Sequence, residues 1–285
     1  MQNFYRLVFL LFSFSVFSQN DYAIFNISSE LLENANSVLL DEYVELDVSE
    51  EKKMVITSHK AITILNKKGD RHANTVIYYD DDSKAKDAEV YVFDALGNEI
   101  QYFKKRDFID VSAVSGGTLY SNSRALYLNY NPASYPYTLV FNYKYETSST
   151  AFIPGWQPLT DYVSSTKKST YKILFNENNK PRYRASNFEG FNISISENPT
   201  EFIFEAENLN SIAYEDLSRS FDNIAPKVNF ALDKFYLKGV AANVRNWKEF
   251  GSWMQNSLLY DVNDLPDGTK EMAKSLVKEE TTNIG

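Results

Sequence analysis

The sequence predicts a mainly β protein built from antiparallel strands stacked as one or more sandwiches, with one helix near the N-terminus and two near the C-terminus. Aromatic residues make up 15% of the chain, chiefly 20 Tyr and 20 Phe, and such residues favour a half-buried pleated surface. The clearest strand, "YTLVFNYKY" at 137–145, places an apolar side chain at every second position. Turn residues separate runs of this kind at intervals of roughly 8–15 residues, a spacing typical of antiparallel sandwiches.

Residues 1–18 are predicted to be an export signal. Arg6 supplies positive charge, 7–17 is an unbroken stretch of apolar residues and Ser, and Ser18 ends a cleavage site before Gln19. A stretch this short does not reach the roughly 20 residues that span a bilayer. We therefore expect an exported protein, periplasmic, cell-surface or secreted, without a membrane span. The alternative is an uncleaved N-terminal anchor.

Composition excludes several classes of chemistry. The chain has no Cys, so it cannot form disulfides, thiolate metal sites or a Cys nucleophile. Its formal net charge is −9 with a pI near 4.9. A charge of this sign disfavours binding to nucleic acid and to anionic lipid.

Three segments are predicted to be hairpins. They are 89–103, which turns around Gly97, 61–79, which turns around Gly69, and 196–208, which turns at Asn198 and Pro199. Pro and Gly residues interrupt the strand pattern within 148–162. The interruption predicts a first β-sandwich region at 19–150 and a second β-rich region at 151–245.

Helical spacing occurs at both ends of the chain. Near the start, 28–47 has a cap at Ser28 or Ser29 and apolar residues as far as Leu39 on one side. Near the end, Asn246 precedes apolar residues at helical spacing, and Pro266 permits a second helix. We expect 246–285 to be a helical lead-in to a further domain.

No motif specifies a metal or another cofactor, and none is expected. His59 and His72 lie outside any H-x-x-H pattern and are interpreted as ordinary surface or core imidazoles. The acidic run Asp80–Asp82 lacks the pattern of a calcium loop and is interpreted as a solvated turn. Arg124 is expected to form a structural ion pair. A pair of carboxylates acting in glycoside hydrolysis stays open, because such a pair is defined by geometry.

The aromatic surplus suggests a ligand-binding surface. Tyr120, Tyr135 and Trp156 lie beside Gly, Asn or Pro in expected loops, where aromatic rings can stack on a sugar or a peptide. The alternative is that these rings belong to the core, as aromatic residues in strands usually do.

Four segments together resemble a known family. They are "AITILNKKGDRHA", "AEVYVFDALGNEI", "SGGTLYSNSRALYLNYNPASYPYTLVFNYKYET" and "WKEFGSWMQNSLLYDVNDLP". They resemble a domain of unknown function that is found in exported bacterial proteins directly ahead of a transglutaminase-like domain. The resemblance covers about residues 40–260.

The resemblance implies a β-sandwich followed by a helical entry to a papain-like domain with a Cys-His-Asp triad. This chain has no Cys, and both His precede the region where the triad would lie, so no catalytic residue is carried over. The implied function is a non-catalytic accessory module that supports the downstream domain of the same polypeptide or presents substrate to it, with the catalytic domain absent from this chain. The alternative is a stand-alone protein that binds an extracellular glycan or peptide.

Overall fold

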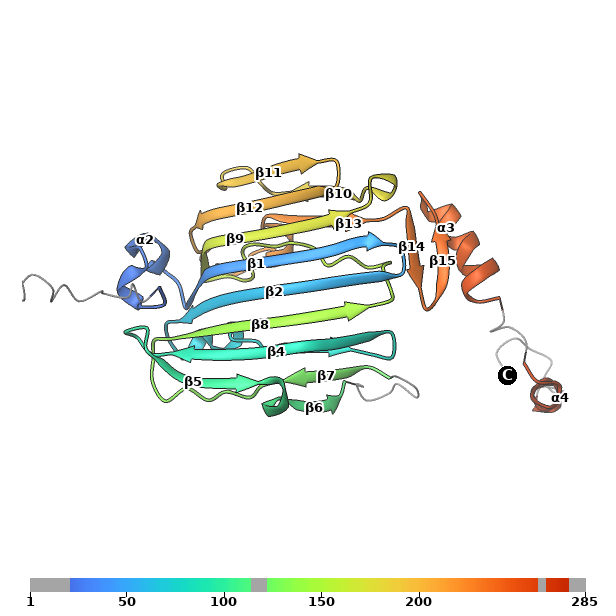
Figure 1. Ribbon diagram of the computed structural model, residues 1–285, viewed down its shortest axis with the longest axis horizontal. Coiled ribbons are helices and arrows are strands. Elements are labelled where there is room, and N and C mark those ends of the chain that lie inside the picture. The colour runs from blue at the N-terminus through green and yellow to red at the C-terminus, as the bar shows by residue number, and fades with distance from the viewer. Residues whose placement is uncertain (1–20, 114–121, 261–264, 277–285) are drawn as a thin grey trace, which may run out of the picture.

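The computed structural model describes residues 21–113, 122–260 and 265–276. Its main feature is an eight-stranded sheet with the strand order β11-β12-β9-β1-β2-β8-β4-β5 (Figure 1). The strands are β1 (Ser37–Glu50), β2 (Lys53–Ile64), β3 (Val76–Tyr79), β4 (Ser83–Phe93), β5 (Glu99–Lys104), β6 (Ile109–Ser112), β7 (Arg124–Tyr127), β8 (Tyr137–Thr147), β9 (Ser164–Phe175), β10 (Arg182–Ser186), β11 (Ile193–Asn198), β12 (Glu201–Leu209), β13 (Lys227–Ala231), β14 (Lys234–Leu237) and β15 (Val240–Asn243). The helices are α2 (Ser29–Leu32), α3 (Trp247–Trp253), its π-helical continuation Met254–Leu258, and α4 (Asp267–Leu276). The mainly β fold class is confirmed.

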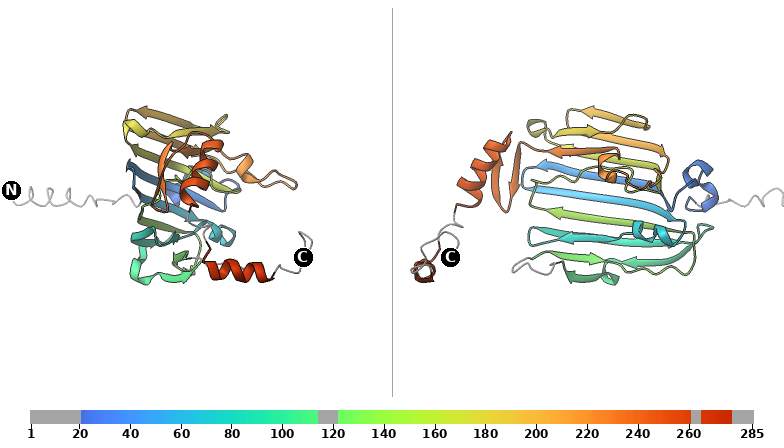
Figure 2. Two further views of the ribbon diagram at one scale, coloured as in Figure 1. Left: turned by 90° about the vertical axis from the view of Figure 1, so that its right-hand side faces the viewer. Right: turned by 180° about the vertical axis from the view of Figure 1, so that it is seen from behind.

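Small sheets cover one face of the large sheet, and we call this face the inner face. In the view from behind, the segment with β13 crosses in front of the large sheet (Figure 2, right). The three strands β3-β7-β6 pack on the same face through Ile77 and Leu126. Alternation along each strand of the large sheet directs one set of side chains to this side. The molecule is therefore a sandwich of unequal layers.

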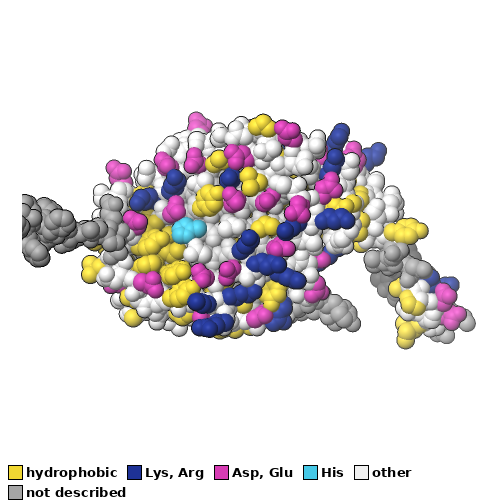
Figure 3. All heavy atoms as spheres, viewed as in Figure 1, with side chains coloured by type: hydrophobic (Ala, Val, Ile, Leu, Met, Phe, Trp, Pro, Cys, Tyr) yellow, Lys and Arg dark blue, Asp and Glu magenta, His cyan; other side chains and the backbone are white. Residues whose placement is uncertain are grey.

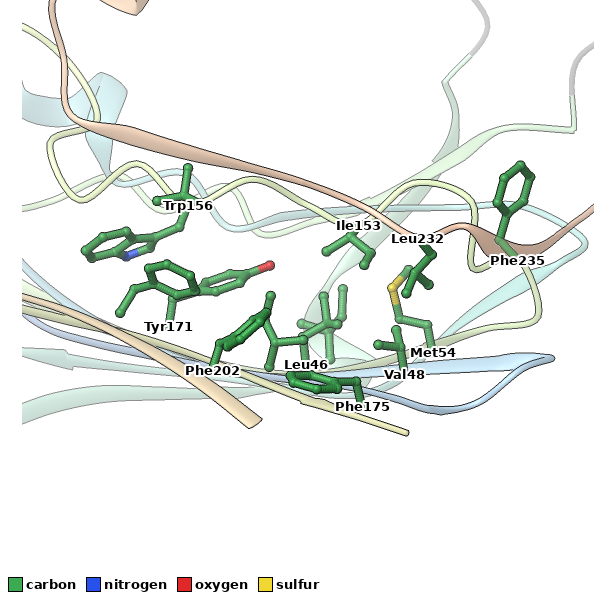
Figure 4. Close-up of a cluster of buried hydrophobic side chains, with 14 of the residues drawn as sticks. Leu46, Val48, Met54, Ile153, Trp156, Tyr171, Phe175, Phe202, Leu232 and Phe235 are labelled. Atoms are coloured by element: carbon green, nitrogen blue, oxygen red, sulfur yellow. The ribbon is translucent and has the colours of Figure 1, made fainter. Parts of the chain in front are cut away.

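The larger core cluster lies between the large sheet and β13. Phe175, Phe202 and Phe204 are fully buried there, and Trp156 packs on Phe204 from the other layer (Figure 4). Tyr171 of β9 stacks on Phe230 of β13. A second cluster fills the space between the large sheet and β3-β7-β6. A smaller third cluster lies on the opposite face, where the segment that contains α2 packs on Val38, Leu40, Ala61 and Val140.

The N-terminal helix is shorter than its spacing predicts. It ends at Leu32, Asn34 has a left-handed φ of 54°, and Leu39 lies in β1 instead of on the helix. β1 pairs with β2 on one side and with β9 on the other. Pairing on both sides therefore overrides a helical pattern that local sequence favours.

The predicted hairpin at 61–79 is wrong. β2 belongs to the large sheet, whereas β3 pairs with β7 in the three-stranded sheet. Gly69 is not in the left-handed region. It is required because a Cβ there would lie 2.2 Å from the carbonyl oxygen of Asn36. The other two hairpins are present as β4–β5, which turns through Gly97 at φ 82°, and β11–β12.

The large sheet crosses the expected boundary at 150/151. Within the first region β1 pairs with β2, β2 with β8 and β8 with β4, while β1 also pairs with β9 from the second region. The β1–β9 pairing is parallel, whereas the other pairings of the described strands are antiparallel. The Pro- and Gly-containing segment after β8 is a connection within one sheet, and its Trp156 forms an isolated bridge to Val228.

The C-terminal part consists of the hairpin β14–β15 followed by α3. Asn246 caps α3 as predicted, and its side chain accepts a hydrogen bond from the Glu249 amide. The predicted second helix is α4, which begins directly after Pro266. Within the described ranges, no helix combines the length and the apolar character needed to cross a membrane.

Candidate functional site

An aromatic hollow lies at the end of the large sheet next to the β14–β15 hairpin. It has a volume of about 330 Å³, and we call it the corner pocket. Its apolar wall includes two strongly exposed rings, Tyr78 at 65% and Phe152 at 70%. The lining residues are Met54, Tyr78, Tyr79, Asp80, Asp82, Ser83, Ser123, Tyr145, Thr147, Ser149, Phe152, Leu237 and Lys238.

Local structure explains why these rings face solvent. In β3, alternation buries Ile77 in the second core cluster and leaves Tyr78 on the open side. Phe152 follows β8 in the connection to β9, one residue ahead of the buried Ile153. A pair of exposed rings beside a hollow is the usual signature of a binding surface.

Lys238 crosses the polar side of the corner pocket. Its Nζ lies 3.0 Å from Asp80 Oδ2 and 2.5 Å from Asp82 Oδ2, so the predicted acidic turn is neutralised by a distant lysine. Lys238 has a left-handed φ of 50° next to Gly239 at 79°, and this tight turn carries it to the acidic residues. Desolvation opposes ionisation of Asp80, but hydrogen bonds from Ser83 and Lys238 outweigh it and lower its pKa. Asp80 therefore stays charged, and both carboxylates are paired with Lys238.

The predicted ion pair of Arg124 is present beside the corner pocket. Arg124 Nε donates to Asp110 Oδ1 at 2.9 Å, and the Tyr79 hydroxyl donates to Asp110 Oδ2 at 2.6 Å. These contacts lower the pKa of Asp110, the Tyr79 bond more than the arginine. The cluster fixes β3, β6 and β7 to one another.

The structure does not bring the three predicted ligand-contact aromatics together. Tyr120 lies outside the described residues. Tyr135 is 37% exposed, and its hydroxyl donates to Asp70 at 2.5 Å, which raises its pKa to about 12. Trp156 is only 2% exposed, so its ring has a core position and no open face for a ligand.

Trp156 is held by an interior polar chain. Its indole N–H donates to Ser169 Oγ at 2.8 Å, and Ser169 donates to Glu42 Oε2 at 2.6 Å. Glu42 lies opposite Lys60 in the β1–β2 register. Burial raises the pKa of Glu42 and lowers that of Lys60, each against the attraction of the other. These hydrogen bonds give the Trp156 indole, the Ser169 hydroxyl and the Glu42 carboxylate partners inside the sandwich.

A second interior cluster contains the residue types of a hydrolase triad. His72 Nδ1 lies 2.7 Å from Ser37 Oγ, and Nε2 lies 3.3 Å from Asp161 Oδ2. Arg71 lies against both groups, with its Nε 3.1 Å from His72 Nε2 and its Nη2 3.1 Å from Asp161 Oδ2, so the carboxylate is already paired with a guanidinium.

A catalytic serine must be open to its substrate. Ser37 is fully buried, and its hydroxyl has a second hydroxyl partner, Ser164, at 2.9 Å. The cluster is therefore a structural clamp that ties the 3₁₀ turn Lys67–His72 to β1 and β9.

Among the residues that the structure describes, the geometry supports no catalytic centre. The chain has no Cys, and the described residues contain no group of His, Asp and Glu side chains suited to a metal ion. The residues of the corner pocket that sequence reasoning missed are Tyr78, Phe152 and Lys238. Alternation in β3 marks Tyr78 as outward-facing, but Lys238 is 158 positions from Asp80 and no local signal connects them.

A solved structure of another protein shares the fold. A putative protease from Parabacteroides distasonis superimposes with a TM-score of 0.61 at 12% identity, covering 86% of this chain and 47% of that protein. The chain thus spans about half the length of that protein. Two other structures are far less similar. An M1 zinc metallopeptidase from Deinococcus radiodurans has a TM-score of 0.29 at 9% identity, covering 68% of this chain and 42% of that protein. Yeast LTA4 hydrolase has a TM-score of 0.30 at 12% identity, covering 70% of this chain and 30% of that protein. At such scores neither likeness indicates a shared function.

No curated protein matches the sequence. A family match does exist and covers residues 50–213, which is more than half of the 285 residues. The matched part runs from the end of β1 to the loop after β12, so it includes most of the large sheet and all strands from β3 to β8. The chain belongs to the family of domains of unknown function DUF3857.

Proposed function

We propose that this chain is the non-catalytic β module of an exported protein, and that it holds a following transglutaminase-like domain and presents substrate to it. The observation that carries the proposal is the contrast between α3, which is anchored in the sandwich core, and α4, which exposes its apolar side chains. The missing thiol supports a non-catalytic role for the chain itself.

The anchor of α3 is aromatic. Trp253 is buried against Phe235 with ring centroids 5.5 Å apart, and its indole N–H donates to the Ala241 carbonyl at 2.7 Å. Phe250 packs against the same two rings. A helix fixed in this way gives any segment that follows it a defined starting direction.

The surface that follows the anchor is apolar and exposed. Leu259, Tyr260 and Leu265 precede α4, and Met272 and Leu276 lie four positions apart on one side of it. No residue of α4 is buried. A helix of 10 residues with an open apolar face is marginal in water, and a domain packed on that face would stabilise it.

Hydrogen exchange tests this proposal directly. In the chain of 285 residues we expect α4 amides to exchange far faster than those of α3. In a polypeptide extended by the downstream coding sequence, α4 should gain protection of at least about tenfold, since a packed helix opens only with its domain. Equal exchange of α4 in both proteins, or a downstream frame without Cys, His and Asp, contradicts the proposal.

A second candidate is direct binding of an extracellular glycan or peptide by the chain. The exposed rings of Tyr78 and Phe152 at the corner pocket favour it. Titration of the purified chain with neutral and acidic oligosaccharides tests this candidate, and loss of binding on Tyr78→Ala with retention on Tyr214→Ala, an exposed ring outside the pocket, is the expected result.

A further inference from the structure

A local reversal of charge lies next to the corner pocket. The chain as a whole carries −9, yet three lysines, Lys84, Lys86 and Lys105, line one hollow of about 360 Å³. Its other lining residues are Tyr79, Ala85, Asp110 and Leu126. We call this hollow the lysine groove.

The groove exists because β4 is longer than its edge partner. The β4–β5 register runs only from Glu89 opposite Lys104 to Phe93 opposite Glu99. The first part of β4 therefore has β8 on one side and no β5 residue on the other. A bulge between Ala85 and Asp87 bends this unpaired part. The open strand edge and the neighbouring three-stranded sheet form the two walls.

The positive charge in the groove is not cancelled by its one carboxylate. Asp110 already binds Arg124 and Tyr79, so the groove lysines have little share in it. Lys105 is held in place by donating to the Ala85 carbonyl at the open edge. Lys86 has an ion pair with Glu146 at 3.2 Å.

Lys84 is the least compensated member. No carboxylate of the described residues lies within ion-pair distance of it, although it lies opposite Glu146 in the β4–β8 register. Lys and Arg side chains also gather over β8, β4 and β5 on the uncovered face of the sheet (Figure 3). A small anion in the groove would therefore meet Lys84, whose ammonium group has no carboxylate partner among the described residues, and Lys105, whose acceptor is a carbonyl.

The lysine groove and the corner pocket are adjacent hollows. Tyr79 lines both hollows, and Tyr78 and Phe152 lie exposed on the far side. A ligand long enough to cover both would place an anionic group against the lysines and a flat ring face against the aromatics. An oligosaccharide that carries carboxylate or sulfate groups has both features.

We propose that the lysine groove and the corner pocket together bind an acidic oligosaccharide. Lys84, Lys86 and Lys105 bind its anionic groups, and Tyr78 and Phe152 stack on its sugar rings. This inference rests on the glycan-binding candidate above and is independent of a downstream catalytic domain. Its failure in a binding assay would leave the exchange test of α4 unaffected.

Calorimetric titration of the full chain with hexagalacturonate tests the proposal. The triple variant K84Q/K86Q/K105Q should bind at least about tenfold more weakly, since charge-assisted contacts dominate such sites. The matched control K167Q/K248Q/K274Q removes the same charge at positions outside the groove and should change affinity less than about twofold at physiological salt, where distant charges are screened. Neutral cellohexaose should not bind measurably.

Further experiments compare carboxylate with sulfate ligands and control for misfolding of the variants. A sulfated hexasaccharide should bind in competition with hexagalacturonate, and Tyr78→Ala should weaken both without changing the far-ultraviolet circular dichroism. The single variant K84Q, which removes no internal ion pair, should still weaken binding if the triple variant unfolds. Equal affinities of groove and control variants overturn the proposal. So does binding to phosphatidylglycerol vesicles in the absence of binding to either oligosaccharide.

Discussion

At the scale of single residues, interior polar groups decide where the large side chains sit. Trp156 is a core residue because its N–H has a buried acceptor in Ser169, which itself binds Glu42. An indole N–H without an acceptor would pay the cost of desolvation, whereas here it is satisfied. The aromatic side chain therefore adds both packing area and a specific contact between the layers.

Replacement of Trp156 should strongly destabilise the protein. We expect Trp156→Ala to lower the free energy of unfolding by about 3–5 kcal/mol, since it leaves a large cavity, and Trp156→Phe by about 1–3 kcal/mol, since Ser169 loses its donor. Urea unfolding measures both changes. The matched control is Trp247→Ala on a side chain that is 87% exposed, which should cost less than about 1 kcal/mol.

His72 should make stability depend on pH. Burial lowers the pKa of His72 below its ordinary value of 6.5, against the pull of Asp161, and the nearby Arg71 and Lys60 lower it further. Below about pH 6.5 the unfolded state therefore takes up a proton that the folded state refuses, so the free energy of unfolding falls on acidification. The contribution is complete above pH 6.5 and is lost at a rate of at most about 1.4 kcal/mol per pH unit.

His72→Gln should flatten that dependence. Urea midpoints measured between pH 5 and pH 7.5 should vary less in the variant than in the parent chain. His59→Gln is the control, because His59 is half-exposed and bonded to Asn142. Parallel pH profiles of His72→Gln and the parent chain would show that the buried ring does not titrate as described.

At the scale of elements, the 3₁₀ turn Lys67–His72 holds together the strands at one end of the large sheet. Asn66 caps it, Asp70 accepts from Tyr135 and Tyr137, and His72 binds Ser37. Gly69 lets the turn approach β1 closely at Asn36. The conspicuous "NKKGDRH" run is thus explained by packing between distant strands.

Close packing around Gly69 and open space around Gly251 predict different effects of replacing each glycine by alanine. Gly69→Ala should lower the free energy of unfolding by about 3 kcal/mol, since its Cβ would lie 2.2 Å from Asn36 O and 3.2 Å from the Ile64 side chain. Gly251→Ala has nothing within 4 Å and lies inside α3, so it should be neutral or raise stability by up to about 1 kcal/mol. Thermal and urea unfolding compare the pair; a harmless Gly69→Ala would contradict the close approach.

At the scale of the whole molecule, one sheet integrates both halves of the chain. Parallel pairing of β1 with β9 makes the second region an extension of the first. β12 and β11 then extend the sheet from β9 to its far edge. Strands shared in this way cannot separate without breaking backbone hydrogen bonds in the centre of the sheet.

Unfolding should consequently be a single transition. All three Trp follow residue 150, so Trp fluorescence reports on the part of the chain after that residue while circular dichroism reports on all strands. We expect both signals to change at the same urea concentration, as a cooperative domain requires. A fluorescence transition displaced from the circular dichroism transition would indicate two independent domains.

The sequence by itself determined the local structure. Alternation identified β8, β9 and two of the three hairpins, since period-2 burial and turn residues are readable over short stretches. The Asn246 cap, the start of α4 and the ion pair of Arg124 were also predictable, because caps and charge pairing depend on residue type.

The tertiary structure alone decided which strands pair and which side chains share a site. The short α2, the separation of β2 from β3 and the β1–β9 pairing depend on contacts far apart in sequence, which local periodicity does not encode. The same holds for the ion pair of Lys238 with Asp80 and for the proximity of Lys84 and Lys105 at an unpaired strand edge. Burial of Trp156 and exposure of Tyr78 follow from how the layers close, because a residue's environment is set by what packs against its face.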